Sequence, residues 1–232
     1  MVLVCHSKEF VFLKTRKTAG TTVEMVLEPL CAPPGHVVKE QTPARLSRYG
    51  IIGTRRIPQR RPMWLYRHSN FWRNHMGAEK TRTALGPEKF DRYTKISAVR
   101  EPFSRSVSQF RWRLQEAGRD ASSMEFSEQR AAFRDFVAGG DWPDDREIVH
   151  VGGRYVIDHA VRFEHLAEDL KALIERLGLG LSAEAIPHTK STGGPRKSIP
   201  LADYYDAESI ATVRQRFSWV YDHFDYPDRP GA

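Results

Sequence analysis

The sequence predicts an α/β protein in which helices flank a central, mainly parallel β-sheet. Short apolar runs of β type alternate with segments whose apolar residues recur at helical spacing. Two strand-to-helix transitions follow the same order: an apolar run, a cation-bearing turn, and an amphipathic helix. Strands that alternate with helices are typical of parallel sheets, because a crossover helix connects parallel neighbours.

One domain over residues 1–232 is expected, because 232 residues form one full core and leave little room for a second. No apolar run approaches the length of a membrane span, and no secretory signal precedes the first strand, so we expect a cytoplasmic enzyme. The net charge of +7 favours an anionic partner.

The cysteines and histidines show no metal-binding pattern. Cys5 and Cys31 are too few for a disulfide framework, and neither stands at a zinc-ligand spacing. The histidines form no H-x-H or H-E-x-x-H motif. We therefore predict that the protein uses no metal.

The first strand-to-helix transition begins with a strand over residues 10–13. Apolar residues at helical spacing follow at Val23, Val26, Leu27 and Leu30. Between them, Arg16-Lys-Thr-Ala-Gly-Thr-Thr22 combines cations, hydroxyls and a glycine, and these suit an anion at a helix N-terminus. Gly20 would let the backbone lie close to a ligand.

Other interpretations of this turn remain open or are excluded by the pattern. Thr21 or Thr22 could simply cap the helix, and Lys17 could be solvated. The turn is not a Walker A loop, because its glycine follows the lysine. No G-x-G-x-x-G follows a strand, so a dinucleotide site has no support.

Residues 53–73 interleave arginines with aromatic residues, among them Arg55, Arg56, Arg60, Arg61, Trp64 and Trp72. Such a segment could bind single-stranded nucleic acid by phosphate pairing and base stacking. It could also line the binding site of a substrate that accepts a transferred group, with aromatics against a sugar or small ring. We call this possibility the acceptor wall. A core-packing loop with a solvated basic rim is the third interpretation.

The second strand-to-helix transition spans residues 95–111. Pro102 suits the first turn of a helix, and Phe103, Val107 and Phe110 share one side of it, with Arg105 and Ser108 on another. Ligands of parallel sheets bind beyond the carboxyl ends of the strands. We therefore expect Lys17 and Arg100 to face one crevice.

The last third of the chain contains further elements of the same kind. Residues 155–163 hold two short apolar runs. An amphipathic helix carries Leu166, Leu170, Leu173, Ile174 and Leu177 and stops at Gly178. A last helix is expected to carry Ile210, Val213, Phe217 and Val220.

The two transitions together resemble sulfotransferases that use 3′-phosphoadenosine 5′-phosphosulfate (PAPS), especially the carbohydrate, family 2-like branch. Residues 16–22 look like their 5′-phosphosulfate loop, usually Pro-Lys-Thr-Ala-Gly-Thr, and residues 99–108 look like their 3′-phosphate motif. Residues 162–170 and 217–226 are similar to the closing elements of the family. Arg16 replaces the usual proline, and Glu101 replaces the usual Asp or Asn.

The resemblance implies a P-loop-like sulfotransferase fold and a set of cofactor contacts. Lys17 would contact the bridging oxygen and steady the leaving phosphate. The 5′-phosphate contacts would come from Arg16, Thr18, Ala19, Gly20, Thr21 and Thr22, and those to the 3′-phosphate from Arg100 and Ser108. A late Gly/Pro loop over residues 188–198 adds Lys190, Arg196 and Lys197 as candidates for the 3′-phosphate, although a solvated surface loop is an alternative.

The acceptor hydroxyl also needs a base, which similar enzymes place upstream of the 3′-phosphate strand. His75 is the candidate, because an imidazole can accept a proton at physiological pH. His68 and Glu79 are the rivals, and His75 could instead cap or pack a short helix.

The expected function is therefore in-line transfer of a sulfuryl group from PAPS to a hydroxyl of a carbohydrate or small-molecule acceptor. Nucleic-acid binding through residues 53–73 is the alternative that leaves both phosphate motifs unexplained. A P-loop-like nucleotide kinase is the second alternative, disfavoured by the absent Walker pattern. The sequence leaves the acceptor and the oligomeric state open.

Overall fold

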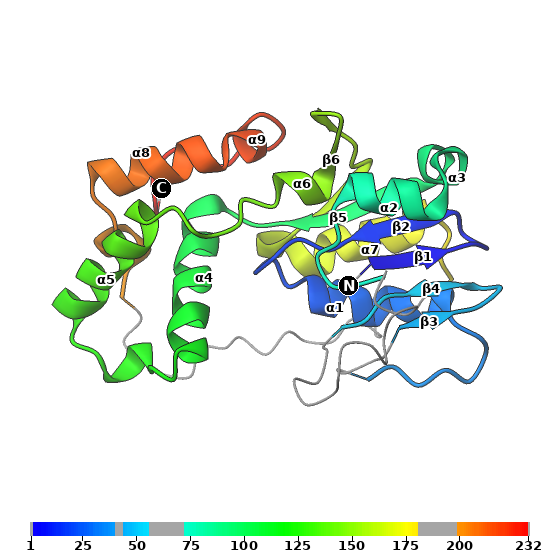
Figure 1. The fold of residues 1–232 in the computed structure, drawn as a ribbon, viewed down its shortest axis with the longest axis horizontal. Helices are drawn as coiled ribbons and strands as arrows, with labels where there is room; N and C mark the ends of the chain where they lie inside the picture. Colours follow the sequence, from blue (N-terminus) through cyan, green and yellow to red (C-terminus); the bar gives the residue numbers. More distant parts are fainter. Residues whose placement is uncertain (1, 40–43, 56–71, 181–198, 232) are drawn as a thin grey trace. The chain divides into compact units, whose positions relative to one another are not determined.

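A computed structural model describes residues 2–39, 44–55, 72–180 and 199–231 (Figure 1). The chain divides into two compact units. The first comprises Met1–Val99 and Asp145–Thr189, and the second comprises Arg100–Asp144 and Lys190–Ala232. The prediction of one domain over residues 1–232 stays a prediction.

The first unit is built on a sheet that is six-stranded within the described residues. Its order is β3 (Arg45–Leu46), β4 (Gly50–Ile52), β1 (Val2–Cys5), β2 (Phe10–Leu13), β5 (Thr94–Val99) and β8 (His159–Arg162). The predicted strand over residues 10–13 is confirmed as β2.

The sheet is mixed, which corrects the expectation of a mainly parallel one. β2, β5 and β8 are parallel, as predicted, whereas β3, β4, β1 and β2 pair antiparallel. β1 and β2 are separated by a turn of four residues, and so short a connection permits only a hairpin. Because β1, β3 and β4 did not figure in the sequence prediction, neither did their antiparallel pairing.

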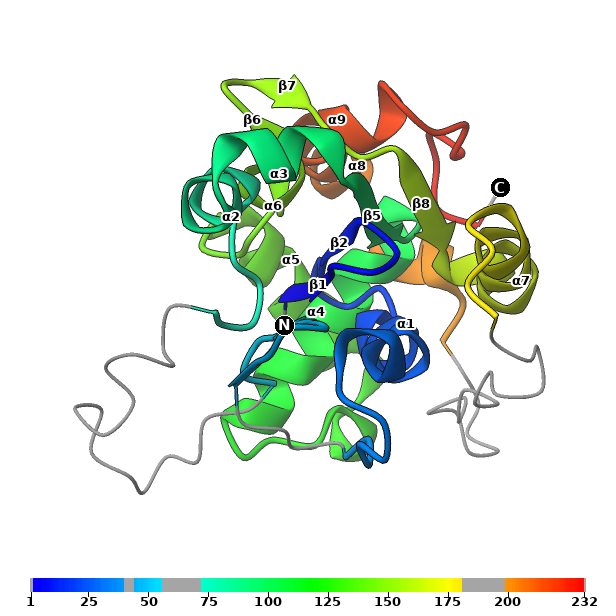
Figure 2. The ribbon, with the colours of Figure 1, turned by 90° about the vertical axis from the view of Figure 1, so that its right-hand side faces the viewer.

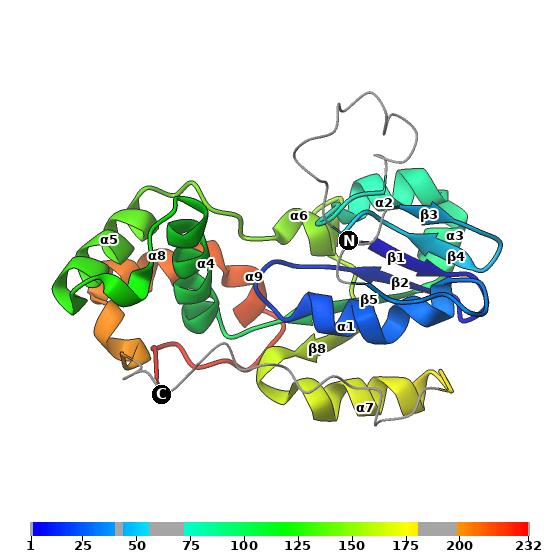
Figure 3. The ribbon, with the colours of Figure 1, turned by 90° about the horizontal axis from the view of Figure 1, so that it is seen from below.

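Helices cover both faces of this sheet (Figures 2 and 3). α1 (Gly20–Leu27) and α7 (Leu166–Arg176) lie on one face, and α2 (Ala78–Leu85), α3 (Pro87–Arg92) and α6 (Arg146–Val149) lie on the other. β6 (His150–Val151) and β7 (Arg154–Tyr155) form a separate two-stranded sheet.

Alternate strand residues form the main core with α1 and α7. Phe10, Phe12, Ile96 and Ala98 are buried, and they meet the apolar stripes of the two helices in one cluster. The stripes are the predicted ones, with Val23, Val26, Leu27, Leu166, Leu170, Leu173 and Ile174. The helix over 166–177 is confirmed as α7, and Gly178, with a φ of 53°, follows its end.

The described part of the second unit is helical. Its α-helices are α4 (Pro102–Glu116), α5 (Phe126–Ala138), α8 (Ala207–Arg216) and α9 (Ser218–Tyr221). The predicted apolar side of α4 is confirmed, since Phe103, Val107 and Phe110 are all buried. The predicted last helix is interrupted at Phe217, which follows α8 and precedes α9.

Short 3-10 helices complete the described elements: η1 (Glu28–Cys31), η3 (Ala121–Ser123), η4 (Phe163–His165) and η6 (Leu201–Tyr204). The predicted position of Leu30 on the first helix is thus moved into η1. Pro29 accounts for the change, because it lacks the backbone N–H that an α-helix would use there.

Candidate active site

The loop between β2 and α1 is anchored to the carboxyl end of β5. The hydroxyl of Thr15 donates a hydrogen bond to the carbonyl oxygen of Ala98 (2.5 Å), and the hydroxyl of Ser97 donates to the carbonyl oxygen of Leu13 (2.7 Å). β2 and β5 are parallel neighbours, so both strands end at the same edge of the sheet. The predicted strand, turn and helix are confirmed at this place.

Among the described residues, no side chain caps the N-terminus of α1. Ala19 is the N-cap residue, and it and Lys17 adopt left-handed backbone conformations, with φ of 57° and 63°. The alternative in which Thr21 or Thr22 caps the helix is wrong, because both lie in its first turn. The first N–H groups of a helix lack intrahelical partners, so this terminus has donors for an anion.

Arg16 is held by a buried carboxylate that the sequence analysis did not identify. Asp145 accepts the backbone N–H of Arg16 at 2.6 Å and also pairs with its guanidinium, and the Asp145 side chain is fully buried. A proline could not donate the first of these bonds. Asp145 lies 129 residues further along the chain, so no local pattern pointed to it.

Lys14 lies beneath the first turn of α1 and was also missed. Its ammonium donates to the Thr21 hydroxyl (2.8 Å) and to the Glu24 carboxylate (2.7 Å). A Cβ on Gly20 would lie 2.8 Å from Cγ of Lys14. The glycine is therefore required by the lysine stem under the helix, a reason that differs from the expected approach of a ligand.

The same buried cluster includes an arginine from the segment 53–73. Arg55 pairs with Glu28, and its Nε lies 3.5 Å from the Glu24 carboxylate. His36 contacts Glu28 at 2.7 Å. Arg55 thus belongs to the interior of the first unit, as does Trp72, which is 5% exposed. The other arginines and aromatics named in this segment lie outside the described residues.

His75 adjoins the start of the loop. Its Nδ1 lies 3.0 Å from the carbonyl oxygen of Lys14. A carbonyl can only accept, so Nδ1 carries the proton and Nε2 keeps a lone pair. Burial, with the cationic charges of neighbours that include Arg16 and Lys14, lowers the pKa of His75 from 6.5 to about 2. The rival Glu79 is exposed on α2, and His68 lies outside the described residues.

Arg100 and Ser108 belong to the second unit. Nε of Arg100 donates to the Ser104 hydroxyl (2.9 Å), and Ser104 and Ser108 lie one turn apart on α4. Arg105, one turn before Ser108, is buried, with its guanidinium 4.4 Å from the centroid of the Phe217 ring. Glu101 caps α4 by accepting from the N–H groups of Phe103 (2.8 Å) and Ser104 (2.5 Å).

Other expectations fall outside what is described or stay predictions. Lys190, Arg196 and Lys197 lie outside the described residues. Within the described part, no group of three His, Cys, Asp or Glu side chains could hold a metal ion, and the absence of a metal stays a prediction. No described helix combines the length and apolarity that a membrane span requires.

Comparison with known protein families shows to which family the chain belongs. A family model described as "Sulfotransferase family" matches residues 1–150, which include the 16–22 loop, His75, Arg100 and Asp145. No curated protein and no solved structure is significantly similar to the chain. The matched region covers more than half of the sequence and contains both predicted phosphate motifs. The chain therefore belongs to the sulfotransferase family.

Proposed function

We propose that the protein transfers a sulfuryl group from PAPS to a hydroxyl of a carbohydrate or small-molecule acceptor. The observation that carries this proposal is the uncapped N-terminus of α1, preceded by the left-handed Lys17 and Ala19, in a chain of the sulfotransferase family. In this proposal β2, the loop after it and α1 bind phosphate as a P-loop does. The proposal also includes a cytoplasmic location.

The loop residues would bind the 5′ end of the donor. The backbone N–H groups at the start of α1, from residues such as Ala19 and Gly20, suit a phosphate. Thr21 and Thr22 are half-buried and can add hydroxyl donors, whereas the Thr18 hydroxyl is buried and bound to Thr15 at 2.9 Å. Thr18 would therefore contribute through its backbone.

Lys17 would act on the oxygen that joins the sulfuryl group to the 5′-phosphate, and His75 on the oxygen of the attacking hydroxyl. PAPS supplies an activated sulfur–oxygen bond, and its cleavage leaves negative charge on the 5′-phosphate. Lys17 would stabilise that charge as it develops. His75 would take the proton of the attacking hydroxyl at Nε2, the nitrogen that keeps its lone pair.

The low pKa of His75 bears on this role. An imidazole that resists protonation stays neutral throughout the physiological range, so its lone pair is always available. The same low pKa makes it a weak base in the ligand-free protein. Binding of the anionic donor beside Arg16 and Lys14 would raise the pKa of His75 and so strengthen the base.

The 3′-phosphate would be bound by Arg100 and Ser108, with Lys190, Arg196 and Lys197 as further candidates. Ser104 holds the Arg100 guanidinium by its Nε, and this orients the remaining N–H groups. The segment 53–73 would supply the acceptor wall through its residues other than Arg55 and Trp72.

Binding of the product nucleotide tests the donor. We expect 3′-phosphoadenosine 5′-phosphate to raise the melting temperature of the full chain, and ATP with magnesium to raise it much less, because only the former offers a 3′-phosphate. Arg100→Ala should abolish most of this difference. Equal stabilisation by ATP, with no response to the bisphosphate, would favour the kinase.

Activity tests the chemistry. The full chain is incubated with radiolabelled PAPS and a panel of glycans and small alcohols. With an acceptor found, Lys17→Ala should lower turnover more than it weakens bisphosphate binding. His75→Asn should cost about a hundredfold in rate at unchanged bisphosphate affinity. If Glu79→Gln or His68→Asn shows that signature instead, His75 is not the base.

A further inference from the structure

Lys14 and Glu24 form a buried ion pair directly under the first turn of α1. The distance from Nζ to Oε2 is 2.7 Å, and the two side chains are 8% and 0% exposed. Burial lowers the pKa of Lys14, and the charge and hydrogen bond of Glu24 act in the opposite direction. Burying two charges costs free energy, which close pairing offsets only in part.

Lys14 has a second partner, the hydroxyl of Thr21, and this contact fixes the direction of a hydrogen bond. Nζ of Lys14 lies 2.8 Å from Oγ1 of Thr21, and an ammonium can only donate. Thr21 therefore accepts this hydrogen bond and keeps its own hydroxyl proton for another acceptor. Within the described residues, that hydroxyl has no protein acceptor, and Thr21 is half-buried at the second position of α1.

We propose that Lys14 is a positioning residue, which orients the Thr21 hydroxyl as a donor to the 5′-phosphate of the sulfuryl donor. This role rests on the proposed function. The ammonium holds the Thr21 oxygen from below, so the hydroxyl proton is directed away from Lys14 and is available to a ligand. The same contact polarises the hydroxyl, which strengthens its donation to an anion.

Two neighbours keep Lys14 in this place. Glu24 holds the ammonium, and its own position is supported by Arg55, whose Nε lies 3.5 Å away. Gly20 leaves room for the lysine stem, since a Cβ there would meet Cγ of Lys14 at 2.8 Å. Lys14, Gly20 and Thr21 thus pack as one cluster, although only Gly20 and Thr21 lie in the motif-like stretch 16–22.

A double-mutant cycle tests the role. The variants are Lys14→Met, Thr21→Val and the two combined, and calorimetry measures the Kd of 3′-phosphoadenosine 5′-phosphate. Each single change should weaken binding about tenfold, the loss expected for a hydrogen bond to a charged group. In the Thr21→Val background, Lys14→Met should change the Kd by less than about twofold, because the hydroxyl through which it acts is gone.

Lys95→Met is the matched control, because it removes the same charge from the same unit. Lys95 lies near the amino end of β5, pairs with Asp158 at 3.0 Å and is 13% exposed, so its loss should leave the Kd unchanged. Urea denaturation of every variant separates lost stability from lost affinity. If Lys14→Met does not fold, Lys14→Met with Glu24→Gln removes both charges and repeats the cycle.

The outcomes are distinct. If Lys14→Met weakens binding equally with and without the Thr21 hydroxyl, Lys14 acts as a general charge and the positioning role is wrong. If the unchanged protein binds the bisphosphate and Thr21→Val has no effect, Thr21 is no ligand contact and the role is also wrong. If the unchanged protein does not bind the bisphosphate at all, the proposed donor is wrong, and the positioning role that depends on it is wrong too.

Discussion

Left-handed backbone at non-glycine residues is concentrated around the candidate loop. Lys17, Ala19, His75 and Asp145 all have positive φ. Such conformations cost free energy and persist where surrounding contacts hold them. Here the contacts are visible, because Asp145 binds Arg16 and His75 binds the carbonyl of Lys14. Single residues far apart in sequence thus fix the loop conformation.

The Arg16–Asp145 pair should contribute strongly to stability. Asp145→Asn removes the charge but tolerates the positive φ of 62°. Arg16 keeps only part of its pairing, and we expect a loss of about 1–3 kcal/mol in urea denaturation. Asp91→Asn is the control, since Asp91 pairs with Arg82 on the surface and is 56% exposed, where water screens the pair, so its loss should change stability much less. Equal losses would contradict the importance of burial.

His75 should make the protein less stable as the pH falls. Its folded pKa is about 2 and its ordinary value is 6.5, so between these values the unfolded chain binds a proton that the native chain does not. Unfolding is favoured by about 2 kcal/mol at about pH 5 relative to neutral pH on this account. His75→Asn should reduce the fall in stability between about pH 7 and pH 5. An unchanged slope would show that His75 titrates normally.

The two strand-to-helix elements achieve their helix starts by different means. α4 begins with a side-chain cap from Glu101 and with Pro102 in its first turn, whereas α1 begins without a side-chain cap and packs on a lysine. Glu101, which stands where similar enzymes usually have Asp or Asn, caps α4 with both of its carboxylate oxygens. The uncapped α1 is the element left with donors for a ligand.

The effect of Gly20→Ala on the stability of the protein should depend on the side chain at residue 14. Where the native backbone suits alanine, replacing glycine by alanine usually stabilises a protein by about 0.4–1 kcal/mol, because the unfolded chain loses conformational freedom. Here its Cβ would meet the Lys14 stem at 2.8 Å, so we expect Gly20→Ala to destabilise the protein. In a Lys14→Ala background, which lacks the Cγ, the same change should be neutral or stabilising. Thermal unfolding of the four variants measures this, and destabilisation in both backgrounds would contradict the packing argument.

Loss of the Glu101 cap should cost about 1 kcal/mol in the Glu101→Ala variant, because the N–H groups of Phe103 and Ser104 lose their acceptor. Glu125 offers a matched control. It is the N-cap residue of α5 but makes no side-chain cap bond, so Glu125→Ala should change stability little. Urea denaturation of both variants decides, and similar losses would mean that the Glu101 bonds contribute nothing specific.

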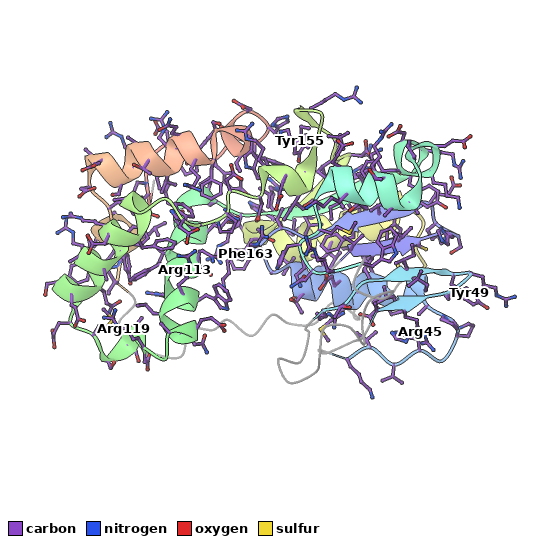
Figure 4. The ribbon with its side chains drawn as sticks, viewed as in Figure 1. Arg45, Tyr49, Arg113, Arg119, Tyr155 and Phe163 are labelled. Carbon is purple, nitrogen blue, oxygen red and sulfur yellow. The ribbon has the colours of Figure 1, made fainter. Side chains whose placement is uncertain are left out.

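Across the whole molecule, the net charge of +7 does not translate simply into a surface for polyanions. Arg55 is buried beside Glu24 and Glu28. Exposed arginines, among them Arg113 and Arg119, also have acidic partners. Arg119 pairs with Glu128 at 3.1 Å, and Arg113 lies 3.6 Å from Asp141. Both arginines are labelled in Figure 4. Pairing of this kind reduces the number of cations that could replace counterions on a nucleic acid.

Oligonucleotides should therefore bind weakly to the full chain at physiological salt. Arg55→Ala should lower stability, because it leaves Glu24 and Glu28 with less buried positive charge, and it should not change oligonucleotide affinity. Fluorescence anisotropy with a labelled single strand over a salt series measures the binding. Tight binding that falls steeply with salt and is lost in the triple variant Arg56→Ala, Arg60→Ala, Arg61→Ala would revive the nucleic-acid alternative.

The sequence by itself determined the α/β class, the strand over residues 10–13, α7, the apolar side of α4 and the family. These follow from periodicity and from motifs whose parts are close in the chain, and local backbone preferences are enough to express them. It did not reveal β1 or its hairpin with β2, the interruption at Phe217, or the burial of Arg55 and Trp72.

Only the tertiary structure decided which residues surround the loop. Asp145 reaches Arg16, and Ala98 meets Thr15, from distant parts of the chain. Lys14 stands beside the motif-like stretch, yet nothing local distinguishes a lysine that is solvated from one buried on Glu24. The physical reason is that burial and pairing of a charge depend on what packs around it, and packing brings together residues that the sequence separates.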